Sequence, residues 1–297
     1  MAWVSRSVGN RSKGAPVRSA MLSPAMERPL ASPKRAASTA PSAPPRRRQQ
    51  IWIVLPAYNE EASLPALLEA IDESMFEAGL SYRVLVMDDG SDDRTPAIAT
   101  EAATRLPVVV RRHERNLGLG ATIRDGLVAA VELAEAKDIL VTMDADNTHT
   151  PELILRMVRL VREGHDVVIA SRYRTGSRIR GVPWFRRALS YWGSWLFRVL
   201  FPTPGVRDYT CGYRAYRAAV LQAVVAEEGR DFFEQSGFQC MVDILLKLRA
   251  GKGPRELIFG EVPLVLRYDL KEGASKMRVW KTVRDTLALV VRRRFGR

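Results

Sequence analysis

Long apolar runs, paired cysteines and a glycine-rich nucleotide fingerprint are all missing from this sequence. No run of roughly 18 uninterrupted apolar residues occurs, so we predict no transmembrane helix. The two cysteines, Cys211 and Cys240, have no paired spacing and no companion histidine, which argues against a zinc site or disulfide framework and fits a reducing cytosolic compartment. No Gly-x-Gly-x-x-Gly follows the first expected strand, where Pro56 stands instead, and this disfavours a Rossmann-type oxidoreductase.

Acidic residues are almost absent from the first 50 positions, where Glu27 stands against ten Lys and Arg. This stretch therefore holds most of the net charge of +13, and residues 51–297 are only mildly basic. Its Pro-, Ser-, Ala- and Arg-rich composition predicts a disordered basic tail over residues 1–50. A basic nucleic-acid-binding protein is the alternative from a different class. Because the excess charge lies in the tail, we expect a solvated tail and no nucleic acid partner.

Apolar runs alternate with stretches of helical periodicity from residue 51 onward. The expected strands cover residues 51–55, 83–87, 108–110, 137–143 and 166–170, and the expected helices cover residues 60–77, 93–105, 117–135 and 151–163. This alternation predicts an α/β fold with a mostly parallel, doubly wound, Rossmann-like sheet. We assign residues 51–275 to this single domain.

The most informative stretch is Ile139–Pro151, ILVTMDADNTHTP. It places Asp144 and Asp146 at the carboxyl end of a buried strand, where open α/β sheets bind their ligands. Two carboxylates at positions i and i+2 suit Mg²⁺ or Mn²⁺, hard cations that share oxygen ligands with substrate phosphates. An Asx-rich turn without metal is the alternative. His149 could contact a metal through water, but a histidine that stabilises the turn fits the sequence at least as well.

Two further polar loops, Pro56–Glu60 and Asp88–Ser91, follow the first two expected strands. Because the carboxyl ends of parallel strands share one edge of the sheet, we expect all three loops to converge there. Such a pocket could hold a base, a ribose and a pyrophosphate. Tyr58 could pack on the base, and Asp89 or Glu60 could accept hydrogen bonds from the base or ribose.

Aromatic residues and arginines mix in Trp184–Phe201, WFRRALSYWGSWLFRVLF. A helix of this kind suits a membrane interface, since aromatic rings lie at headgroup depth and arginines meet lipid phosphates. A core helix of an enlarged domain fits about equally well. Residues 276–297 carry eight Lys and Arg against Asp285 alone, which predicts a basic amphipathic C-terminal helix, either solvated or anchored on an anionic membrane.

Together these motifs resemble the inverting family 2 glycosyltransferases of GT-A fold and, more narrowly, the polyprenol-phosphate (dolichol-phosphate) mannosyltransferases. The resemblance covers residues 52–284. Beyond the three loops it rests on Ser171-Arg172-Tyr173, Asp208-Tyr209-Thr210, Tyr213–Arg217, Glu261-Val262-Pro263, Arg267 and Ser275-Lys276.

The resemblance implies a role for each matching residue. Asp144, Asp146 and Arg172 would be the catalytic residues, and Arg186 and Ser190 would meet the acceptor phosphate. The nucleotide-sugar pocket would comprise Pro56, Tyr58, Glu60, Met87, Asp89, Asp144, Ala145, Asp146, Arg172, Arg267 and Lys276.

The chain departs from the family pattern in two places. Thr148 stands where some members carry glutamine as a third metal ligand beside Asp144 and Asp146, so this ligand would be Thr148 Oγ or water. Arg267 and Lys276 lie farther apart in sequence than usual, which implies a longer loop over the diphosphate.

The implied reaction is metal-dependent transfer of a hexose to a polyprenyl phosphate with inversion, and we expect mannose from GDP-mannose. A UDP-sugar that supplies glucose or an N-acetylhexosamine is the alternative. The acceptor phosphate is already ionised, which fits the lack of any nucleophile–base pattern among His113, His149 and His165. We expect peripheral attachment to the cytoplasmic face of a membrane, through C-terminal amphipathic, membrane-interface helices or a separate membrane-anchoring protein.

Overall fold

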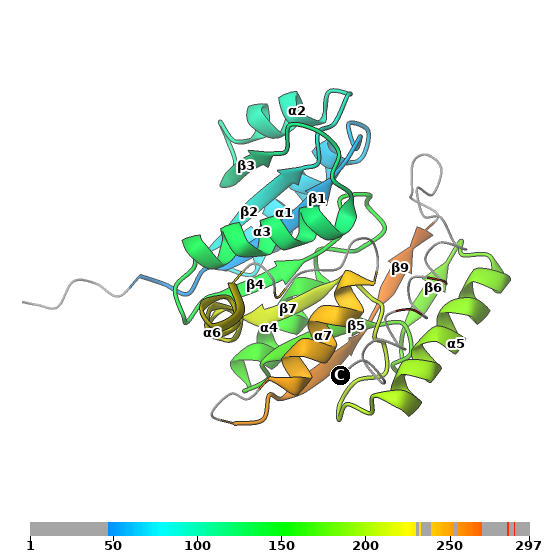
Figure 1. Ribbon diagram of the computed structural model, residues 1–297. Coiled ribbons are helices and arrows are strands. Elements are labelled where there is room, and N and C mark those ends of the chain that lie inside the picture. The colour runs from blue at the N-terminus through cyan, green and yellow to red at the C-terminus, as the bar shows by residue number, and fades with distance from the viewer. Residues whose placement is uncertain are drawn as a thin grey trace, which may run out of the picture. The chain divides into compact units, whose positions relative to one another are not determined.

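Runs of β-branched and aliphatic residues form a seven-stranded sheet in this computed structural model (Figure 1). The structure describes residues 47–229, 232, 239–251, 255–268, 284 and 288, without the side chains of Phe185 and Arg186. The predictions for the tail up to residue 46, for Lys276 and for nearly all of the C-terminal helix therefore lie outside the described residues.

The large sheet is mostly parallel, as the sequence predicts. Its strands are β1 Ile51–Ala57, β2 Tyr82–Asp88, β3 Val108–Arg112, β4 Ile139–Thr142, β5 Val167–Ser171, β7 Arg214–Arg217 and β8 Phe259–Pro263. They lie in the order β3-β2-β1-β4-β7-β5-β8, and only β7 runs antiparallel to its neighbours, β4 and β5. A small parallel sheet pairs β6 Arg178–Arg180 with β9 Val265–Arg267.

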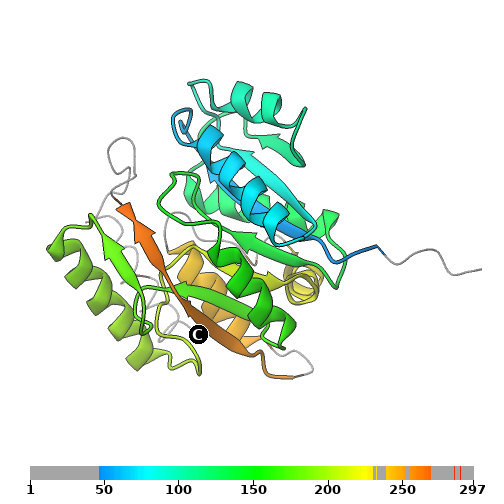
Figure 2. The same cartoon turned by 180° about the vertical axis from the view of Figure 1, so that it is seen from behind.

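Helices cover both faces of the large sheet. They are α1 Leu64–Glu77, α2 Thr95–Ala102, α3 Leu119–Leu133, α4 Leu153–Arg162, α5 Trp184–Leu200, α6 Ala218–Glu228 and α7 Cys240–Ala250. α3, α6 and α7 lie on the face seen in Figure 1, and α1 and α4 lie on the face seen in Figure 2. This double cover explains the uninterrupted apolar run of Ile51–Leu55, since every side chain in it is buried.

The five expected strands and four expected helices are all present. The helices are shorter than expected, and β1, β2 and β3 are longer. α4, for example, begins at Leu153, and Thr150 and Pro151 form the turn before it, with Thr150 accepting a hydrogen bond from the Leu153 amide at 3.2 Å. β7, β8 and the β6–β9 pair extend the fold beyond the predicted alternation. None of the described helices is long and apolar enough to cross a membrane.

Candidate active site

The loops after β1 and β2 are joined directly by hydrogen bonds. The Asn59 amide donates to Ser91 Oγ at 2.9 Å, and the Asp92 amide donates to Asn59 Oδ1 at 2.9 Å. One residue on, the Glu60 amide donates to Thr95 Oγ1 at 2.8 Å. The first two polar loops therefore converge as predicted, and their side chains and amides hold them in register.

The loop after β4 joins the same edge. The Asn147 side-chain amide donates to the Ser63 carbonyl at the start of α1, at 3.2 Å. Asn147 and Asn59 both have positive φ, at 58° and 52°, a left-handed conformation that asparagine tolerates better than most residues. Each of the two loops thus turns sharply at an asparagine, and the third loop lies beside the first two.

The acidic turn, Asp144–Thr148, contains the predicted carboxylate pair. Asp146 Oδ1 accepts hydrogen bonds from the amide of Thr148 at 3.2 Å and from its hydroxyl at 2.7 Å. This is the Asx turn of the alternative interpretation, and Thr148 is buried against it. The Asp144 side chain is 39% exposed, while Ala145 is buried. One turn thus holds one oriented carboxylate and one accessible carboxylate.

His149 contacts the acidic turn through its ring. Its ring is buried and stacks on Tyr213, with ring centroids 4.8 Å apart. Nδ1 accepts a hydrogen bond from the Asp144 amide at 3.3 Å, so the neutral ring carries its hydrogen on Nε2, which lies 4.0 Å from Asp144 Oδ2. A hydrogen on Nε2 excludes direct ligation of a metal by that nitrogen. The bond from the Asp144 amide fits the turn-stabilising interpretation, and a contact with a metal through water stays a prediction.

Two carboxylates from the acidic turn suit Mg²⁺ or Mn²⁺, because hard cations prefer oxygen ligands and complete their coordination with water and phosphate. The described part of the chain holds no cluster of three or more His, Cys, Asp or Glu side chains arranged for a metal. The third ligand, Thr148 Oγ or water, stays a prediction.

The other predicted donor residues lie at the same carboxyl edge. Pro56, Tyr58 and Glu60 are half-buried at and after the end of β1, and Glu60 Oε2 accepts a hydrogen bond from Ser63 at 2.8 Å. Met87 and Asp89 are buried at and after the end of β2. The structure thus brings the predicted nucleotide residues together, while their contacts with a nucleotide stay a prediction.

β9 carries Arg267 to the acidic turn. The Arg267 amide donates to the Thr148 carbonyl at 2.9 Å, and an isolated bridge pairs Leu266 with His149. Arg267 is more than a hundred positions from the acidic turn in sequence, yet its backbone is bonded to it. Its predicted contact with the donor diphosphate stays a prediction.

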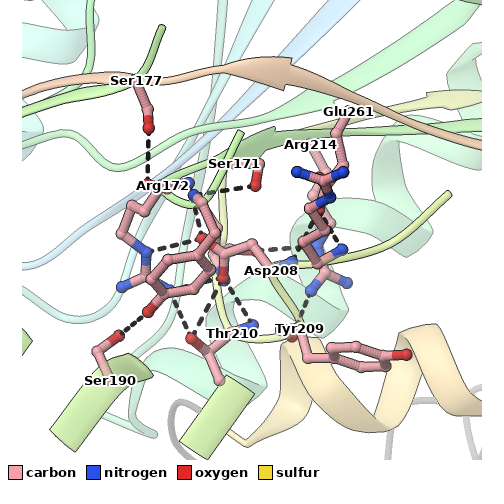
Figure 3. A network of polar contacts seen from close by, with 12 residues as sticks. Ser171, Arg172, Ser177, Ser190, Asp208, Tyr209, Thr210, Arg214 and Glu261 are labelled. Carbon is pink, nitrogen blue, oxygen red and sulfur yellow. Dashed lines mark hydrogen bonds and ion pairs between the residues drawn. The ribbon is translucent and has the colours of Figure 1, made fainter. Parts of the chain in front are cut away.

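Arg172, directly after β5, is held by the buried carboxylate of Asp208 (Figure 3). Nε donates to Oδ2 at 2.8 Å and a terminal nitrogen donates to Oδ1 at 2.7 Å. The same nitrogen also contacts Thr210 Oγ1. Burial would lower the pKa of Arg172, but the Asp208 carboxylate raises it above its ordinary value. The arginine is a permanent, oriented cation, and its predicted contact with phosphate is untested.

Glu261 in β8 supports Asp208 from the other side. Its Oε1 accepts hydrogen bonds from the backbone amides of Arg207 and Asp208, at 2.5 and 2.7 Å. Burial raises the pKa of the Glu261 carboxyl. The sequence motifs contain both acids but do not reveal that they cooperate, because 53 positions separate Asp208 from Glu261.

Ser190, predicted to meet the acceptor phosphate, lies in α5 and accepts a hydrogen bond from the Tyr173 hydroxyl at 2.8 Å. The Arg172 guanidinium lies 5.6 Å from the centroid of the Tyr173 ring. Tyr173 thus contacts both Ser190 of α5 and Arg172, the residue that follows β5. Arg186 lies in the same helix, but its side chain is outside the described residues.

α5 has one buried and one exposed aromatic face. Phe197 is fully buried, whereas Trp184 and Trp192 are 79% and 62% exposed. Edge-to-face contacts connect Tyr191 to Trp192 and Trp192 to Trp195. A core helix accounts for the buried face of α5, which packs on the domain. It does not account for the large aromatic rings that the other face presents to solvent.

Solved structures with the same architecture include glucosyl-3-phosphoglycerate synthase from Mycobacterium tuberculosis, seen with Mn²⁺, UDP and glucosyl-3-phosphoglycerate. The TM-score is 0.59 at 21% sequence identity, over 83% of this chain and 80% of that one. A mostly parallel α/β sheet with an acidic turn at its carboxyl edge, together with this likeness, defines a GT-A-like fold. The chain belongs to glycosyl transferase family 2, whose pattern matches residues 52–225, and the predicted glycosyltransferase class is confirmed.

Several curated proteins are similar to this chain in sequence. Dolichol-phosphate mannosyltransferase of Pyrococcus furiosus is 30% identical over 68% of this chain, and polyprenol monophosphomannose synthase of Mycolicibacterium smegmatis is 36% identical over 60%. The chain spans 54% and 66% of the lengths of these two relatives. Undecaprenyl-phosphate mannosyltransferase of Micrococcus luteus is 33% identical over 77% of this chain and 87% of its own length.

Proposed function

We propose that the protein transfers a hexose to a polyprenyl phosphate with inversion, and that the donor is GDP-mannose. The observation that carries the proposal is the acidic turn, which leaves β4 beside the loops after β1 and β2 and is bonded to the backbone of Arg267. The names of the relatives support the acceptor, since they specify dolichol, polyprenol and undecaprenyl phosphates and mannose.

Asp144 and Asp146 would hold Mg²⁺ or Mn²⁺ together with the donor diphosphate, with Thr148 as a third ligand or as the residue that orients Asp146. A divalent cation supplies positive charge that stabilises a departing nucleoside diphosphate. The acidic turn suits this role, because the Thr148 hydroxyl fixes the direction of one carboxylate and the other is 39% exposed.

The chain itself supplies the rest of the donor site. Pro56, Tyr58, Glu60, Met87 and Asp89 would line the nucleoside pocket. Arg172, Arg267 and Lys276, together with Ala145 of the acidic turn, would lie around the diphosphate. In the reaction, an oxygen of the acceptor phosphate forms a bond to the anomeric carbon as the bond to the diphosphate breaks. The acceptor is already an anion, so the site needs fixed cations more than a general base.

The acceptor would enter from a membrane surface. Exposed Trp184, Trp192 and Trp195 of α5 suit the headgroup layer, and Arg178 and Arg187 nearby in the chain are exposed and suit lipid phosphates. Ser190 and Arg186 on the same helix would receive the acceptor phosphate, on the cytoplasmic face of the membrane. A separate membrane-anchoring protein and the C-terminal residues 276–297 would strengthen this attachment.

The test is to incubate full-length protein with Mg²⁺ or Mn²⁺, a panel of GDP- and UDP-sugars and an undecaprenyl or dolichyl phosphate, and to follow lipid-linked sugar. Asp146→Asn should lose almost all transfer. Asp72→Asn is the matched control, because Asp72 lies on α1 and bonds Tyr82 at the amino end of β2, away from the acidic turn. Absence of transfer from every donor, or full activity in Asp146→Asn, would overturn the proposal.

The same panel separates the alternatives. Transfer from a UDP-sugar in preference to GDP-mannose would overturn the proposed donor and leave the proposed acceptor standing. UDP-sugars belong in the panel because a structural neighbour was seen with UDP. A nucleic-acid-binding protein would instead lose its binding when residues 1–46 are deleted, a cut that keeps Arg47 and Gln50, which contact the buried Asp138. A glycosyltransferase should keep its activity after that deletion.

A further inference from the structure

His113 lies between two carboxylates at the donor edge. It follows β3 directly, its amide donates to the Asp88 carbonyl at 2.9 Å, and its side chain is only 10% exposed. Nδ1 lies 2.8 Å from Asp89 Oδ1 and Nε2 lies 3.1 Å from Asp125 Oδ2. Ionised carboxylates accept hydrogen bonds and do not donate them, so each of these contacts requires a hydrogen on the ring nitrogen that makes it.

Asp89 also holds the turn before α3 through hydrogen bonds. Its Oδ1 accepts from the Leu117 amide and its Oδ2 accepts from the Gly118 amide, each at 2.9 Å. Gly118 has φ of 89°, a conformation that glycine adopts without strain. Asp89 therefore connects the end of β2, where the nucleoside pocket is proposed, to the start of α3.

Asp125 is fixed on its far side by Arg124. The Arg124 Nε donates to Oδ1 at 2.8 Å, and a terminal nitrogen donates to Oδ2 at 2.9 Å. Hydrogen bonds from Arg124 lower the pKa of Asp125, against the effect of burial, so this carboxylate stays ionised opposite His113. A chain of polar contacts therefore leads from the partly exposed side of α3 to the donor edge. Its members are, in order, Arg124, Asp125, His113 and Asp89.

Resting on the proposed function, we propose that His113 is a positioning residue for the sugar-nucleotide donor. By donating to Asp89 it fixes the direction of that carboxylate and, through it, the Leu117–Gly118 turn. Nothing in the transfer step needs His113 to exchange a proton with a substrate.

The test compares His113→Gln with wild type on the full chain. Glutamine can donate toward only one of the two acids. We expect the donor KM to rise about 10-fold, as for loss of one charge-assisted hydrogen bond, with kcat and the acceptor KM within about twofold. Asp125→Asn, which removes only the outer carboxylate, should raise the donor KM in the same direction and by less.

His165→Gln is the matched control. The His165 ring contacts the Leu160 carbonyl near the amino end of β5, away from the donor edge, so the donor KM should not change. Affinity for GDP and UDP with Mg²⁺, measured by calorimetry, provides a readout that does not require transfer. We expect His113→Gln to weaken binding of whichever nucleotide the wild type binds.

The outcomes separate this inference from the proposed function. An unchanged donor KM in folded His113→Gln and Asp125→Asn, or equal losses in kcat and both KM values, would overturn the positioning role. If His113→Gln does not fold, Asp125→Asn alone decides between the two results. Absence of transfer by wild type, together with nucleotide binding that His113→Gln weakens, would overturn the proposed function and leave the role of His113 standing.

Discussion

Two hydrogen bonds join the guanidinium of Arg172 to the carboxylate of Asp208, at 2.8 and 2.7 Å. Asp208 is fully buried, whereas the Arg172 side chain is 20% exposed. A buried carboxylate therefore sets the orientation of a cation at the carboxyl end of β5. Paired guanidinium–carboxylate bonds of this kind fix geometry as well as charge.

Asp208→Asn should reduce sugar transfer by about 10-fold or more and destabilise the fold by up to about 3 kcal/mol, since it removes the counter-charge of Arg172. Urea unfolding and the transfer assay measure the two effects. Glu163→Gln, which breaks an exposed pair with Arg159 on α4, is the control and should change stability by less than about 0.5 kcal/mol. Equal stability of the two variants would contradict the role of Asp208.

The same pair has a defined pH dependence. Burial alone would raise the pKa of Asp208, but Arg172 brings it below the ordinary aspartate value. A lowered pKa in the folded state means that the pair stabilises the fold at neutral pH and that this contribution is lost in acid, as pH falls below about 4. Stability curves of wild type and Asp208→Asn should therefore approach each other in acid.

Glu261 should have the opposite pH dependence. Burial raises its pKa, so the folded state favours the protonated form, and ionisation above the ordinary value of about 4.3 costs stability. Glu261→Gln keeps an oxygen that can accept from the amides of Arg207 and Asp208. We expect this variant to melt slightly higher than wild type at pH 7, with the difference disappearing in acid. A difference that grows in acid would contradict this assignment.

The parallel half of the fold and the acidic turn could be predicted because local patterns determine them. β1 is apolar throughout and β4 is apolar up to its last residue, Thr142, and an apolar strand ending in polar residues has few alternatives to a buried strand at a ligand edge. The convergence of Asn59 with Ser91 then follows from strand order alone.

β7 could not be predicted, because its first residue is a fully buried arginine. Arg214 donates hydrogen bonds to the carbonyls of Cys211, Tyr209 and Met241, at 2.9, 2.8 and 2.6 Å. Burial of this charge depends on carbonyls from a loop and from α7, which no sequence periodicity reports. The pairing of Arg172 with Asp208 could not be predicted either, because the two residues are 36 positions apart and no sequence periodicity relates them.

Thr148 should control metal affinity through Asp146. Thr148→Val keeps the side-chain shape but removes the hydroxyl that donates to Asp146 at 2.7 Å. We expect the Mn²⁺ concentration for half-maximal activity to rise at least ~10-fold, as for loss of a residue that orients a metal ligand. Binding of Mn²⁺, followed by electron paramagnetic resonance, should weaken in parallel. Thr148→Ser is the control and should stay near wild type, whereas equal affinity in all three proteins would contradict the prediction.

Trp192 and Trp195 should carry most of the attachment to lipid. Their rings lie edge to face, 5.6 Å apart, on the exposed side of α5, so both can enter a headgroup layer together. Replacement of both by Ala should weaken binding to anionic vesicles at least ~10-fold, since one large apolar side chain contributes about 1.5–3 kcal/mol when buried. Transfer to a membrane-embedded acceptor should fall with binding. Transfer to a short, water-soluble polyprenyl phosphate should not change, because neither tryptophan is among the residues predicted to meet the donor or the acceptor phosphate.

Phe76→Ala is the control for these tryptophans. Phe76 is 83% exposed, more than either tryptophan, but it lies near the end of α1 and away from α5. If exposed aromatic area alone drove vesicle binding, Phe76→Ala would weaken it as well. If α5 is the attachment surface, Phe76→Ala should bind like wild type while the double tryptophan variant releases. Unchanged vesicle binding by the double variant would leave α5 as a packing helix whose exposed rings do not meet lipid.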